Sequence, residues 1–479
     1  MDLRFFGFLQ HIRRCAQIIY RMGRNDVIHI FSHIDADGIS SAIILAKLLT
    51  SLNKPFILNF VPQIVPNEFM QQWQNIKPRY AIFADLGTSI PYKIMSKTNS
   101  IAIGIILDHH ISHEIEDNDP RIFVVNPRFF NIDGGSEISS SGVAYLVSNM
   151  YSRMIPEIKK FAKYAIVGAI GDSQDIGWHR SLIGLNRAIL EDGQKRGVVT
   201  EQEDLLLIGK GIKPLYRLLA EVYHIEIPSI TGSYDGAANF LVKNGLLRSD
   251  DDIENIYLDD LPKNKRDLLR RRLIELLMVN YPGKYTIESL EDLLTGKIYI
   301  LRDEKIRLLR YARDVAILFN ACGKLRRPQL AFSIAFSGRK EKIAEKMIQI
   351  YDRYRAIISN ILKQLDSKIE YRNGVAIYDG RGEITEELAS TIASIIAASK
   401  TTNAHMVIVF TDSIGGNVKV SARRTTEGKI NDVERIIRDA ISRLTGATGG
   451  GHKEAAGAYI KSEDVDKFLD TVCKSVGET

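Results

Sequence analysis

The chain of 479 residues has little cysteine and no long apolar run, and each absence removes a class of protein. Its three cysteines, Cys15, Cys322 and Cys473, lie far apart and form no CxxC pair. The sequence therefore does not indicate a disulfide framework or a cysteine-ligated zinc site, and it favours a reducing, cytoplasmic environment. No apolar run approaches the roughly 18 residues needed to span a bilayer, so no membrane partner is expected.

The charge balance is only mildly basic. The net charge is +6, and 45% of residues are hydrophobic while 25% are charged. Such a composition is typical of a folded globular protein, and a length prior of about 150 residues per domain predicts two or three domains. The excess of positive charge is compatible with a polyanionic ligand, but it is also common in proteins that bind none.

The N-terminal part alternates between strand and helix patterns. Apolar residues at helical spacing within 1–24 favour an amphipathic helix over a transit peptide. Short runs rich in Ile, Val and Phe then follow at 27–31, 81–84, 101–107 and 122–125, with helical patterns between them. This alternation predicts an α/β fold with a doubly wound, mostly parallel sheet.

The remainder of the chain divides into a helical stretch and a second α/β unit. Residues 206–337 have helical patterns, with an acidic run at 250–260 followed by a basic run at 263–272. One long connecting helix is predicted at about 339–365. Strands are expected at 375–378, 406–410, 418–421 and 458–460, with helices near 384–399, 431–444 and 463–475. The predicted domains are 1–205, 206–337, 338–368 and 369–479.

Acids and histidines follow the predicted strands directly. The first strand leads into His33, Asp35 and Asp37, the second into Asp85, the third into Asp108, His109 and His110, and a helical pattern at 161–169 leads into Asp172. Open α/β sheets place their ligands at the carboxyl ends of the strands, so these side chains are expected to meet there. Carboxylates crowded in this way resist ionising together unless cations neutralise them, which predicts a bound metal pair.

Each of these residues alone also has an ordinary structural explanation. A single acid at a strand end, such as Asp85, is more often a helix cap or a loop acid than a metal ligand. The pair His109 and His110 is as often a satisfied pair in a core as a pair of ligands. The four segments together favour the metal interpretation. Mixed imidazole and carboxylate ligation favours Mn²⁺, although Mg²⁺ is also compatible with several of the ligands.

Two separated groups of residues resemble a known family. The pattern His33-x-Asp35-x-Asp37-Gly38, then Asp85, then Asp108-His109-His110, then Asp172 resembles the four-motif signature of the DHH phosphoesterase family. The run from Gly449 to Gly457 resembles the GGGHxxAAG signature of the domain that accompanies it. Ala321-Cys322-Gly323 and its flanking helix are similar to the archaeal RecJ-like members, which include the GINS-associated nuclease.

The resemblance implies two Mn²⁺ ions in the first domain. One would be held by His33, Asp35 and Asp85, and the other by Asp37, Asp85, His109 and Asp172, so that Asp85 bridges them. Asp108 would orient an imidazole, and His110 would contact the scissile phosphate. The predicted catalytic residues are therefore Asp85, Asp108 and His110.

The resemblance also implies a substrate-binding site near the C-terminus. Gly449, Gly450 and Gly451 would offer backbone N–H groups to a phosphate, and His452 would add a donor. Ser421 and Arg423 resemble a phosphate clamp, although Arg424 stands where the family has a small polar residue, which leaves open the choice of arginine. Arg128, in the segment Asn126-Pro127-Arg128, also matches a family position, but an ordinary strand-ending turn explains this segment equally well.

The expected function is hydrolysis of single-stranded DNA or RNA from an end, in DNA replication or repair. The expected architecture is two α/β lobes, of which the first cuts and the second grips the neighbouring nucleotide. Alternatives are hydrolysis of short RNA or a cyclic dinucleotide, less favoured pyrophosphatase activity, and a scaffold role as a GINS-binding helicase accessory. Residues 206–337 are expected to serve a partner or to form a solvated insertion. The resemblance makes GINS the leading partner, through this segment or an exposed sheet edge of the first lobe. Cutting polarity, the choice between DNA and RNA, and oligomeric state stay open.

Overall fold

The computed structural model describes residues 3–23, 25–111, 119–222, 225–399, 402–425 and 428–477. The chain forms two compact units, Met1–Tyr351 and Asp352–Thr479. Each unit has its own sheet, and the two are described separately below. Among the described residues, no helix combines the length and the apolar character needed to cross a membrane.

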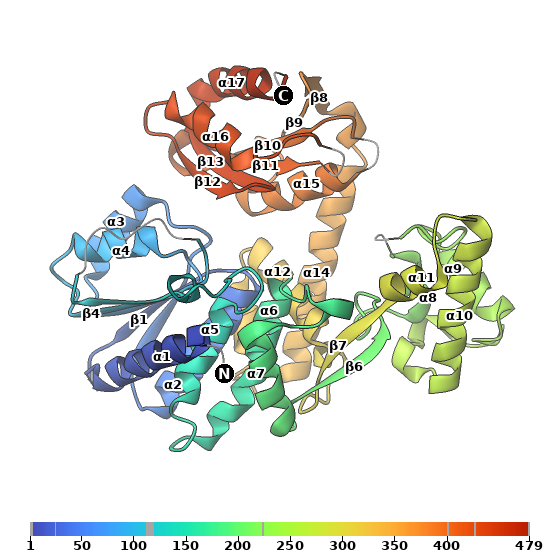
Figure 1. Cartoon of the computed structure of the whole chain (residues 1–479), viewed down its shortest axis with the longest axis horizontal. Coiled ribbons are helices and arrows are strands. Elements are labelled where there is room, and N and C mark those ends of the chain that lie inside the picture. The colour runs from blue at the N-terminus through green and yellow to red at the C-terminus, as the bar shows by residue number, and fades with distance from the viewer. Residues whose placement is uncertain are drawn as a thin grey trace. The chain divides into compact units, whose positions relative to one another are not determined.

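The first unit is built on a parallel sheet of five strands in the order β2-β1-β3-β4-β5 (Figure 1). The strands are β1 Ile28–Ser32, β2 Phe56–Phe60, β3 Tyr80–Ala84, β4 Ile103–Leu107 and β5 Ile122–Val125. The strand order reverses between β1 and β3, and the crevice outside such a reversal is where doubly wound sheets bind their ligands. The predicted parallel sheet is confirmed, with β2 as an unanticipated edge strand whose side chains are only partly buried.

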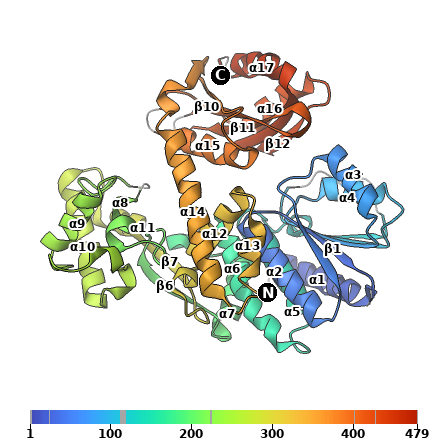
Figure 2. The same ribbon diagram turned by 180° about the vertical axis from the view of Figure 1, so that it is seen from behind.

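Helices cover both faces of this sheet. On one face, α3 Pro66–Ile76 and α4 Ser89–Ser96 enclose an aromatic core that contains Phe31, Trp73 and Phe83. On the other face lie α1 Leu3–Arg21, α2 Ala36–Ser51 and α5 Ser140–Asn149 (Figure 2). α1 is the predicted N-terminal amphipathic helix, and its buried side chains include Phe8, Ile12 and Ile19.

A further helical layer packs behind α2 and supports the loop that follows β1. It consists of α6 Ala162–Gly171, α7 Gly184–Lys195, α12 Ala312–Lys324 and α13 Pro328–Ser333. The side chain of Asn320 on α12 accepts a hydrogen bond from the backbone N–H of Ala36 at 2.8 Å. A Cβ atom at Gly323 would lie 1.9 Å from the carbonyl oxygen of Ile34, so only glycine allows α12 to approach this closely. The Ala321-Cys322-Gly323 segment therefore braces the segment 33–37.

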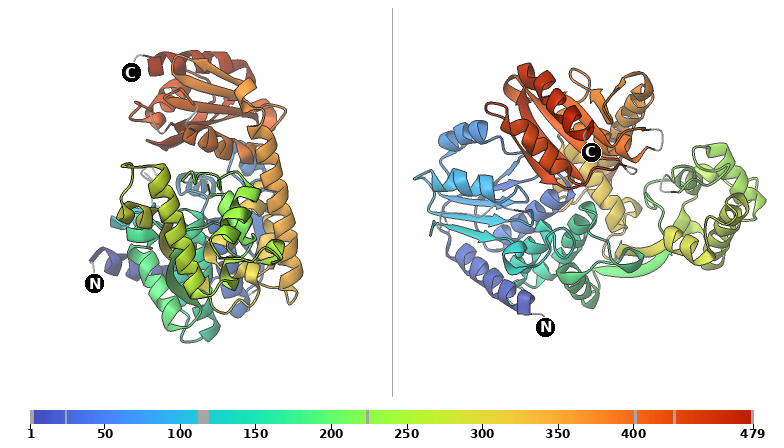
Figure 3. Two further views of the ribbon diagram at one scale, coloured as in Figure 1. Left: turned by 90° about the vertical axis from the view of Figure 1, so that its right-hand side faces the viewer. Right: turned by 45° about the horizontal axis from the view of Figure 1, so that its top comes forward.

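A helical insertion is attached through an antiparallel pair of strands, β6 Val199–Leu205 and β7 Thr295–Leu301 (Figure 3). Between them lie α8 Leu215–Ala220, α9 Tyr234–Lys243, α10 Lys263–Asn280 and α11 Ile287–Leu294. The insertion has its own core, which includes Leu219, Leu241, Leu273 and Leu290. Helices were expected here, but the two strands were not, because β6 reads Val-Thr-Glu-Gln-Glu-Asp-Leu and lacks an apolar pattern.

The second unit contains a mixed sheet of six strands in the order β12-β13-β11-β10-β9-β8. The strands are β8 Ile369–Arg372, β9 Val375–Asp379, β10 Met406–Asp412, β11 Asn417–Arg424, β12 Thr448–His452 and β13 Ala455–Lys461. α15 Glu386–Ala398 and the end of α14 Lys340–Leu362 cover one face, while α16 Val433–Ser442 and α17 Val465–Gly477 cover the other. The predicted long helix is confirmed as α14, and the edge strands β8 and β12 were not anticipated.

Candidate metal centre

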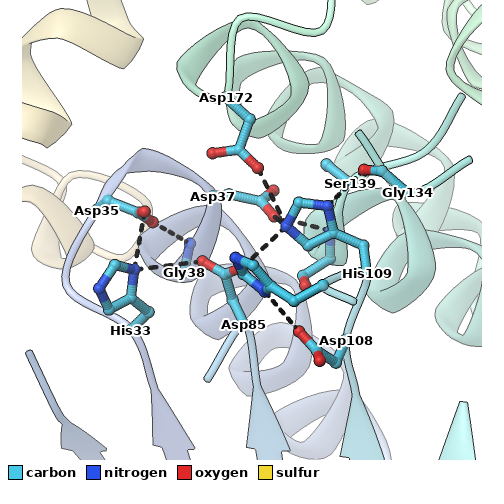
Figure 4. A network of polar contacts seen from close by, with 12 residues as sticks. His33, Asp35, Asp37, Gly38, Asp85, Asp108, His109, Gly134, Ser139 and Asp172 are labelled. Atoms are coloured by element: carbon cyan, nitrogen blue, oxygen red, sulfur yellow. Dashed lines mark hydrogen bonds and ion pairs between the residues drawn. The ribbon is translucent and has the colours of Figure 1, made fainter. Parts of the chain in front are cut away.

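The six side chains predicted as metal ligands converge at the carboxyl ends of β1, β3 and β4 (Figure 4). They fall into two groups that share one carboxylate. Ligand atoms of His33, Asp35 and Asp85 lie within 4.8 Å of one another, and so do those of Asp37, Asp85, His109 and Asp172. The grouping agrees with the division into two ion sites that the sequence resemblance implies.

Asp85 occupies the centre of the arrangement. Its φ angle of 61° is unusual for a residue other than glycine, and such conformations persist only where the surrounding structure holds them. The backbone N–H of Asp85 continues the sheet ladder by donating to the carbonyl of Leu107 at 3.1 Å. Its two buried carboxylate oxygens have no hydrogen-bond partner among the described residues, and they lie 3.3 Å from His109 Nε2 and 3.5 Å from His33 Nδ1.

His33 and Asp35 are positioned by the start of α2. One carboxylate oxygen of Asp35 caps the helix by accepting from the backbone N–H of Gly38 at 2.9 Å, and the other lies 2.8 Å from His33 Nδ1. His33 Nε2 lies 3.1 Å from the carbonyl oxygen of Pro62, to which it donates. Because that bond assigns the ring proton to Nε2, the lone pair on Nδ1 faces the carboxylates.

Asp37 is completely buried and is held by the N-terminus of α5. Its carboxylate accepts hydrogen bonds from the backbone N–H groups of Ser140 at 2.7 Å and Ser141 at 3.0 Å. A helix N-terminus offers unpaired N–H groups and a partial positive charge, both of which favour a carboxylate. The run Ser139-Ser140-Ser141 indicates a helix start in the sequence, but nothing in it identifies Asp37 as the partner.

His109 and Asp172 complete the second group. His109 Nδ1 donates to the carbonyl oxygen of Gly134 at 2.6 Å, which turns Nε2 toward Asp85 and Asp172 at 3.3 Å each. The side chain of Gln174 also donates to the Gly134 carbonyl, at 2.8 Å. Such hydrogen bonds on the far nitrogen fix the orientation of a ligating imidazole. The role of Gln174 was not predicted.

Asp108 orients His110, as the resemblance implied. The buried carboxylate of Asp108 accepts from His110 Nδ1 at 2.8 Å and from the hydroxyl of Thr88 at 2.7 Å. The amide of Asn126 donates in turn to the Thr88 hydroxyl at 3.0 Å. The His110 side chain is 45% exposed, and among the described residues its Nε2 atom has no hydrogen-bond partner. That nitrogen is therefore available to a substrate.

The ionisable groups perturb one another strongly. Burial, followed by repulsion from Asp85, raises the pKa of Asp37 to about 6, and burial and the charge of Asp37 raise the pKa of Asp172 well above its usual range. Burial opposes the charge on Asp85, but the neighbouring imidazoles of His109 and His33 outweigh it and hold its pKa well below the usual value. Burial likewise opposes the charge on both histidines, yet neighbouring carboxylates raise their pKa values well above normal.

The donor set fits a pair of divalent cations. The buried atoms Asp85 Oδ1, Asp85 Oδ2, His109 Nε2 and His33 Nδ1 have no hydrogen-bond partner among the described residues. Protons on the histidines occupy the positions that cations would take, since both neutralise the same carboxylates. Mixed oxygen and nitrogen ligation suits Mn²⁺, and the residues that would hold it are the two groups given above.

Arg128 lies at the edge of this centre. Its Nε atom donates to the backbone carbonyl of His109 at 2.9 Å, and its guanidinium lies 3.2 Å from Asp133. Asn126 caps the turn that follows β5 by accepting from the Arg128 backbone N–H at 3.0 Å. The segment therefore forms the strand-ending turn, and Arg128 also braces the backbone of a predicted ligand, while substrate binding by Arg128 stays a prediction.

In the second unit, Ser421 and Arg423 point to one face of the sheet. They pair with Val409 and Val407, whose side chains lie in the core beneath α15, and residues that pair across strands share a face. Arg423 Nε donates to the hydroxyl of Ser394 on α15 at 3.1 Å. Arg424 points to the opposite face and forms a 2.6 Å ion pair with Glu454. Of the two arginines, Arg423 is therefore the one that has no carboxylate partner among the described residues.

The three glycines expected to bind phosphate lie in β12, an edge strand, and not in a loop. A Cβ atom at Gly449 or Gly451 would lie 2.6 Å or 2.3 Å from a carbonyl oxygen of β13, so these glycines permit close strand pairing. Gly450 pairs with Gly457, which pairs with Ser421, and a Cβ at Gly450 would meet open space. Gly450 is therefore the glycine that leaves room beside Ser421. The side chain of His452 lies outside the described part of the structure.

Two family models match the chain. Residues 27–169 match the DHH family, N-terminal domain, and residues 373–478 match the DHHA1 domain. Together these matches cover slightly more than half of the chain. Over 456 residues, the chain is 29% identical to an uncharacterised protein of Methanocaldococcus jannaschii, and this alignment covers 94% of the chain and 93% of that relative.

The fold is similar to several solved structures. RecJ from Thermus thermophilus in complex with Mn²⁺ has a TM-score of 0.59 and 17% identity, over 98% of this chain and 55% of that protein. An exonuclease RecJ bound to manganese has a TM-score of 0.57 and 16% identity, covering 98% and 94% of the two chains. CDC45 from Entamoeba histolytica has a TM-score of 0.61 and 11% identity, covering 97% and 99%. The chain thus spans about half the length of the Thermus protein.

The raised pKa values predict that Mn²⁺ binding releases protons and tightens between pH 6 and pH 8. Toward the acid end of this range, Asp37, whose pKa is raised to about 6, binds a proton, and the raised pKa values of Asp172, His33 and His109 favour their protonated forms, so an ion must displace protons. Calorimetric titration in two buffers of different ionisation enthalpy measures the release directly. Binding that is independent of pH, with no buffer-dependent heat, would contradict the predicted ligands.

Proposed function

The chain belongs to the DHH family and carries a DHHA1 domain, and from this premise we propose that it is a metal-dependent phosphodiesterase that removes nucleotides from an end of single-stranded DNA or RNA. The observation that carries the proposal is the shared carboxylate of Asp85 between two complete ligand groups. A structural role would leave the two buried carboxylate oxygens of Asp85 without a hydrogen-bond partner among the described residues, whereas a metal pair would compensate their charge. When bound, two such cations activate water and neutralise charge on a phosphoryl group.

The residues of the chain itself contribute orientation and proton donation. Asp108 holds His110 through Nδ1, and the exposed imidazole then presents Nε2 to a phosphate oxygen. Burial opposes the charge on His110, but its hydrogen bond to Asp108 outweighs it and raises its pKa, so the imidazole favours the cationic donor form. Arg128 keeps the backbone of His109 in place.

In the second unit, we assign phosphate binding to the face that contains Ser421, Arg423 and Gly450. Burial lowers the pKa of Arg423 from its usual value, yet the guanidinium stays charged at neutral pH. Among the described residues, Arg423 forms no ion pair with a carboxylate, so its charge is available to a ligand. β12 is an edge strand, which leaves alternate backbone N–H groups without a strand partner. By resemblance, His452 adds a further donor.

Two other functions are tested by the same substrates. Hydrolysis of very short RNA or a cyclic dinucleotide needs the same metal centre but no long strand. The second alternative is a scaffold role, which the similarity of the fold to CDC45 suggests. Such a role needs no hydrolysis. Release of mononucleotides from end-labelled strands of several lengths in Mn²⁺ would support the exonuclease. Cleavage of dinucleotides alone would support the first alternative, and no cleavage of any substrate would favour the scaffold.

Asp85→Ala is expected to abolish hydrolysis without unfolding the protein. The bridging carboxylate contacts both groups of ligands, and its loss leaves two cations to repel each other without a shared anion. Activity on an end-labelled strand and the circular dichroism spectrum should be measured on one preparation. Asp235→Ala, which removes an exposed carboxylate on α9, is the matched control. More than a few per cent of wild-type activity in Asp85→Ala would exclude the bridging role.

Arg423→Ala is expected to lower kcat/KM on a strand roughly ten- to a hundred-fold, because it removes a charge-assisted phosphate contact. Arg424→Ala is the control, since the neighbouring arginine is paired with Glu454 on the opposite face. Hydrolysis of a small phosphodiester with no second nucleotide should be equal in both variants. If both variants lost kcat/KM equally on the long strand, the assignment of phosphate binding to Arg423 in place of Arg424 would be wrong.

We further propose that α10 in the insertion docks a partner in DNA replication or repair, for which resemblance to the archaeal RecJ-like group makes GINS the candidate. The acidic run before α10 is paired elsewhere, as Asp259 with Arg310 at 3.2 Å illustrates, so it does not neutralise the basic run. Arg271 and Arg272 are exposed on α10, where Arg272 pairs with Glu275 at 2.6 Å and Arg271 forms no ion pair among the described residues. An exposed cationic helix favours an acidic partner surface.

Changing Arg271 and Arg272 together to Ala should weaken GINS binding and reduce its salt dependence, while exonuclease activity on a short strand stays unchanged. The matched control is the double change of Arg13 and Arg14 on α1, which are also adjacent and exposed. Affinity and activity should be measured on the same preparation. Unchanged GINS binding would exclude α10 as the docking site, and lost cleavage would place these arginines on the nucleic-acid path.

A further inference from the structure

The loop that leaves the metal centre presents an exposed tryptophan. This loop, residues 172–183, starts at the predicted ligand Asp172 and continues through Gln174, which supports the His109 imidazole by sharing its carbonyl acceptor. It then reaches Trp178, which is 73% exposed. The other tryptophan of the chain, Trp73, is 1% exposed and belongs to the aromatic core of the first sheet.

The loop is held rigidly on both sides of Trp178. Asp175 is buried and is paired with Arg313 of α12. The hydroxyl of Tyr299 on β7 accepts from the backbone N–H of Leu182 at 2.9 Å and donates to the carbonyl of Arg180 at 3.1 Å. Within the segment Trp178–Arg180, His179 and Arg180 adopt φ angles of 52° and 62°. Left-handed conformations at residues other than glycine are costly and cluster where a structure serves a ligand.

Trp178 rests on a fixed support. Its ring stacks on the imidazole of His179, with centroids 3.6 Å apart and an angle of 25° between the planes. His179 is itself anchored to Asp292 at 2.8 Å. One face of the indole is therefore covered by a positioned ring, and most of the remaining surface meets solvent. An aromatic ring held in this way can stack on a nucleobase with little loss of conformational freedom.

A cavity with basic side chains lies next to this platform. Its volume is about 210 Å³, and its lining includes Arg180, Lys297 and Arg313, of which Lys297 pairs with Glu203 at 3.1 Å and Arg313 pairs with Asp175. The acids in the lining are already engaged, because Asp292 binds His179 and the carboxylate of Asp314 accepts from two backbone N–H groups at 3.0 and 2.7 Å. Arg180 is exposed and forms no ion pair with a carboxylate among the described residues. Its charge is available to a phosphate.

We propose that Trp178 is a stacking platform for a base of single-stranded nucleic acid, and that Arg180 binds the adjoining phosphate. The proposal rests on the proposed function and extends it to the path of the strand away from the metal centre. Trp178 lies six positions after Asp172, and a chain of that length spans at most about 22 Å. At roughly 3.4 Å for each stacked nucleotide, the stacked base lies within about six nucleotides of the cut.

Binding without catalysis tests the stacking directly. Because Trp73 is buried, quenching of tryptophan fluorescence by a strand reports on Trp178. Titration of the metal-free protein with oligo(dT) or oligo(rU) of twelve nucleotides should quench the signal, while a dinucleotide should not. Trp178→Phe should bind with similar affinity but without the quench. A strand that binds by fluorescence anisotropy and leaves Trp178 unquenched would overturn the inference while leaving the proposed function intact.

Kinetics supply the second readout. Trp178→Ala should lower kcat/KM on the twelve-nucleotide strand roughly five- to a hundred-fold, the range found for loss of one stacking contact, and should leave dinucleotide hydrolysis unchanged. Tyr20→Ala, which removes another exposed aromatic side chain, is the control and should have no effect. Equal losses on both substrates would indicate a disturbed metal centre, and no loss on either would exclude the platform; both outcomes overturn the proposal.

Discussion

Repulsion among four neighbouring carboxylates is the constraint on which the first unit depends. Asp35, Asp37, Asp85 and Asp172 meet at one edge of the sheet, and Asp37 and Asp85 are buried there. Ionised groups in this arrangement destabilise one another unless positive charge or hydrogen-bond donors compensate. The fold supplies part of the compensation through the N-terminus of α5, which binds Asp37, and through the cap that Asp35 makes on α2. The remaining negative charge is what a bound cation would compensate.

The convergence of these acids could be predicted from the sequence because it follows from topology. Parallel strands end at the same edge, so residues placed directly after β1, β3 and β4 meet whatever the details of packing. The connecting helix α14 could also be predicted, because its apolar residues recur at helical spacing along its 23 residues. The metal assignment itself stays a prediction, since geometry shows that the ligands come together and chemistry indicates what they suit.

Other features could not be read from local sequence. β2, β8 and β12 are edge strands, and edge positions impose a weaker apolar pattern than central ones. The choice between Arg423 and Arg424 depends on strand register, which only the pairing with Val407 settles. The supports of His109 and Asp37 come from residues distant in the chain, and Trp178 looks ordinary until its exposure is known.

The register of β6 and β7 has a consequence for the evolution of the insertion. Leu205, where the insertion begins, lies directly opposite Thr295, where it ends. The gap between its two attachment points is thus only the spacing of adjacent strands, which a tight hairpin turn can bridge. The insertion also has a separate apolar core, so its apolar side chains bury one another. It is therefore a module that related chains can enlarge, replace or lose while the sheet that holds the acids keeps its geometry.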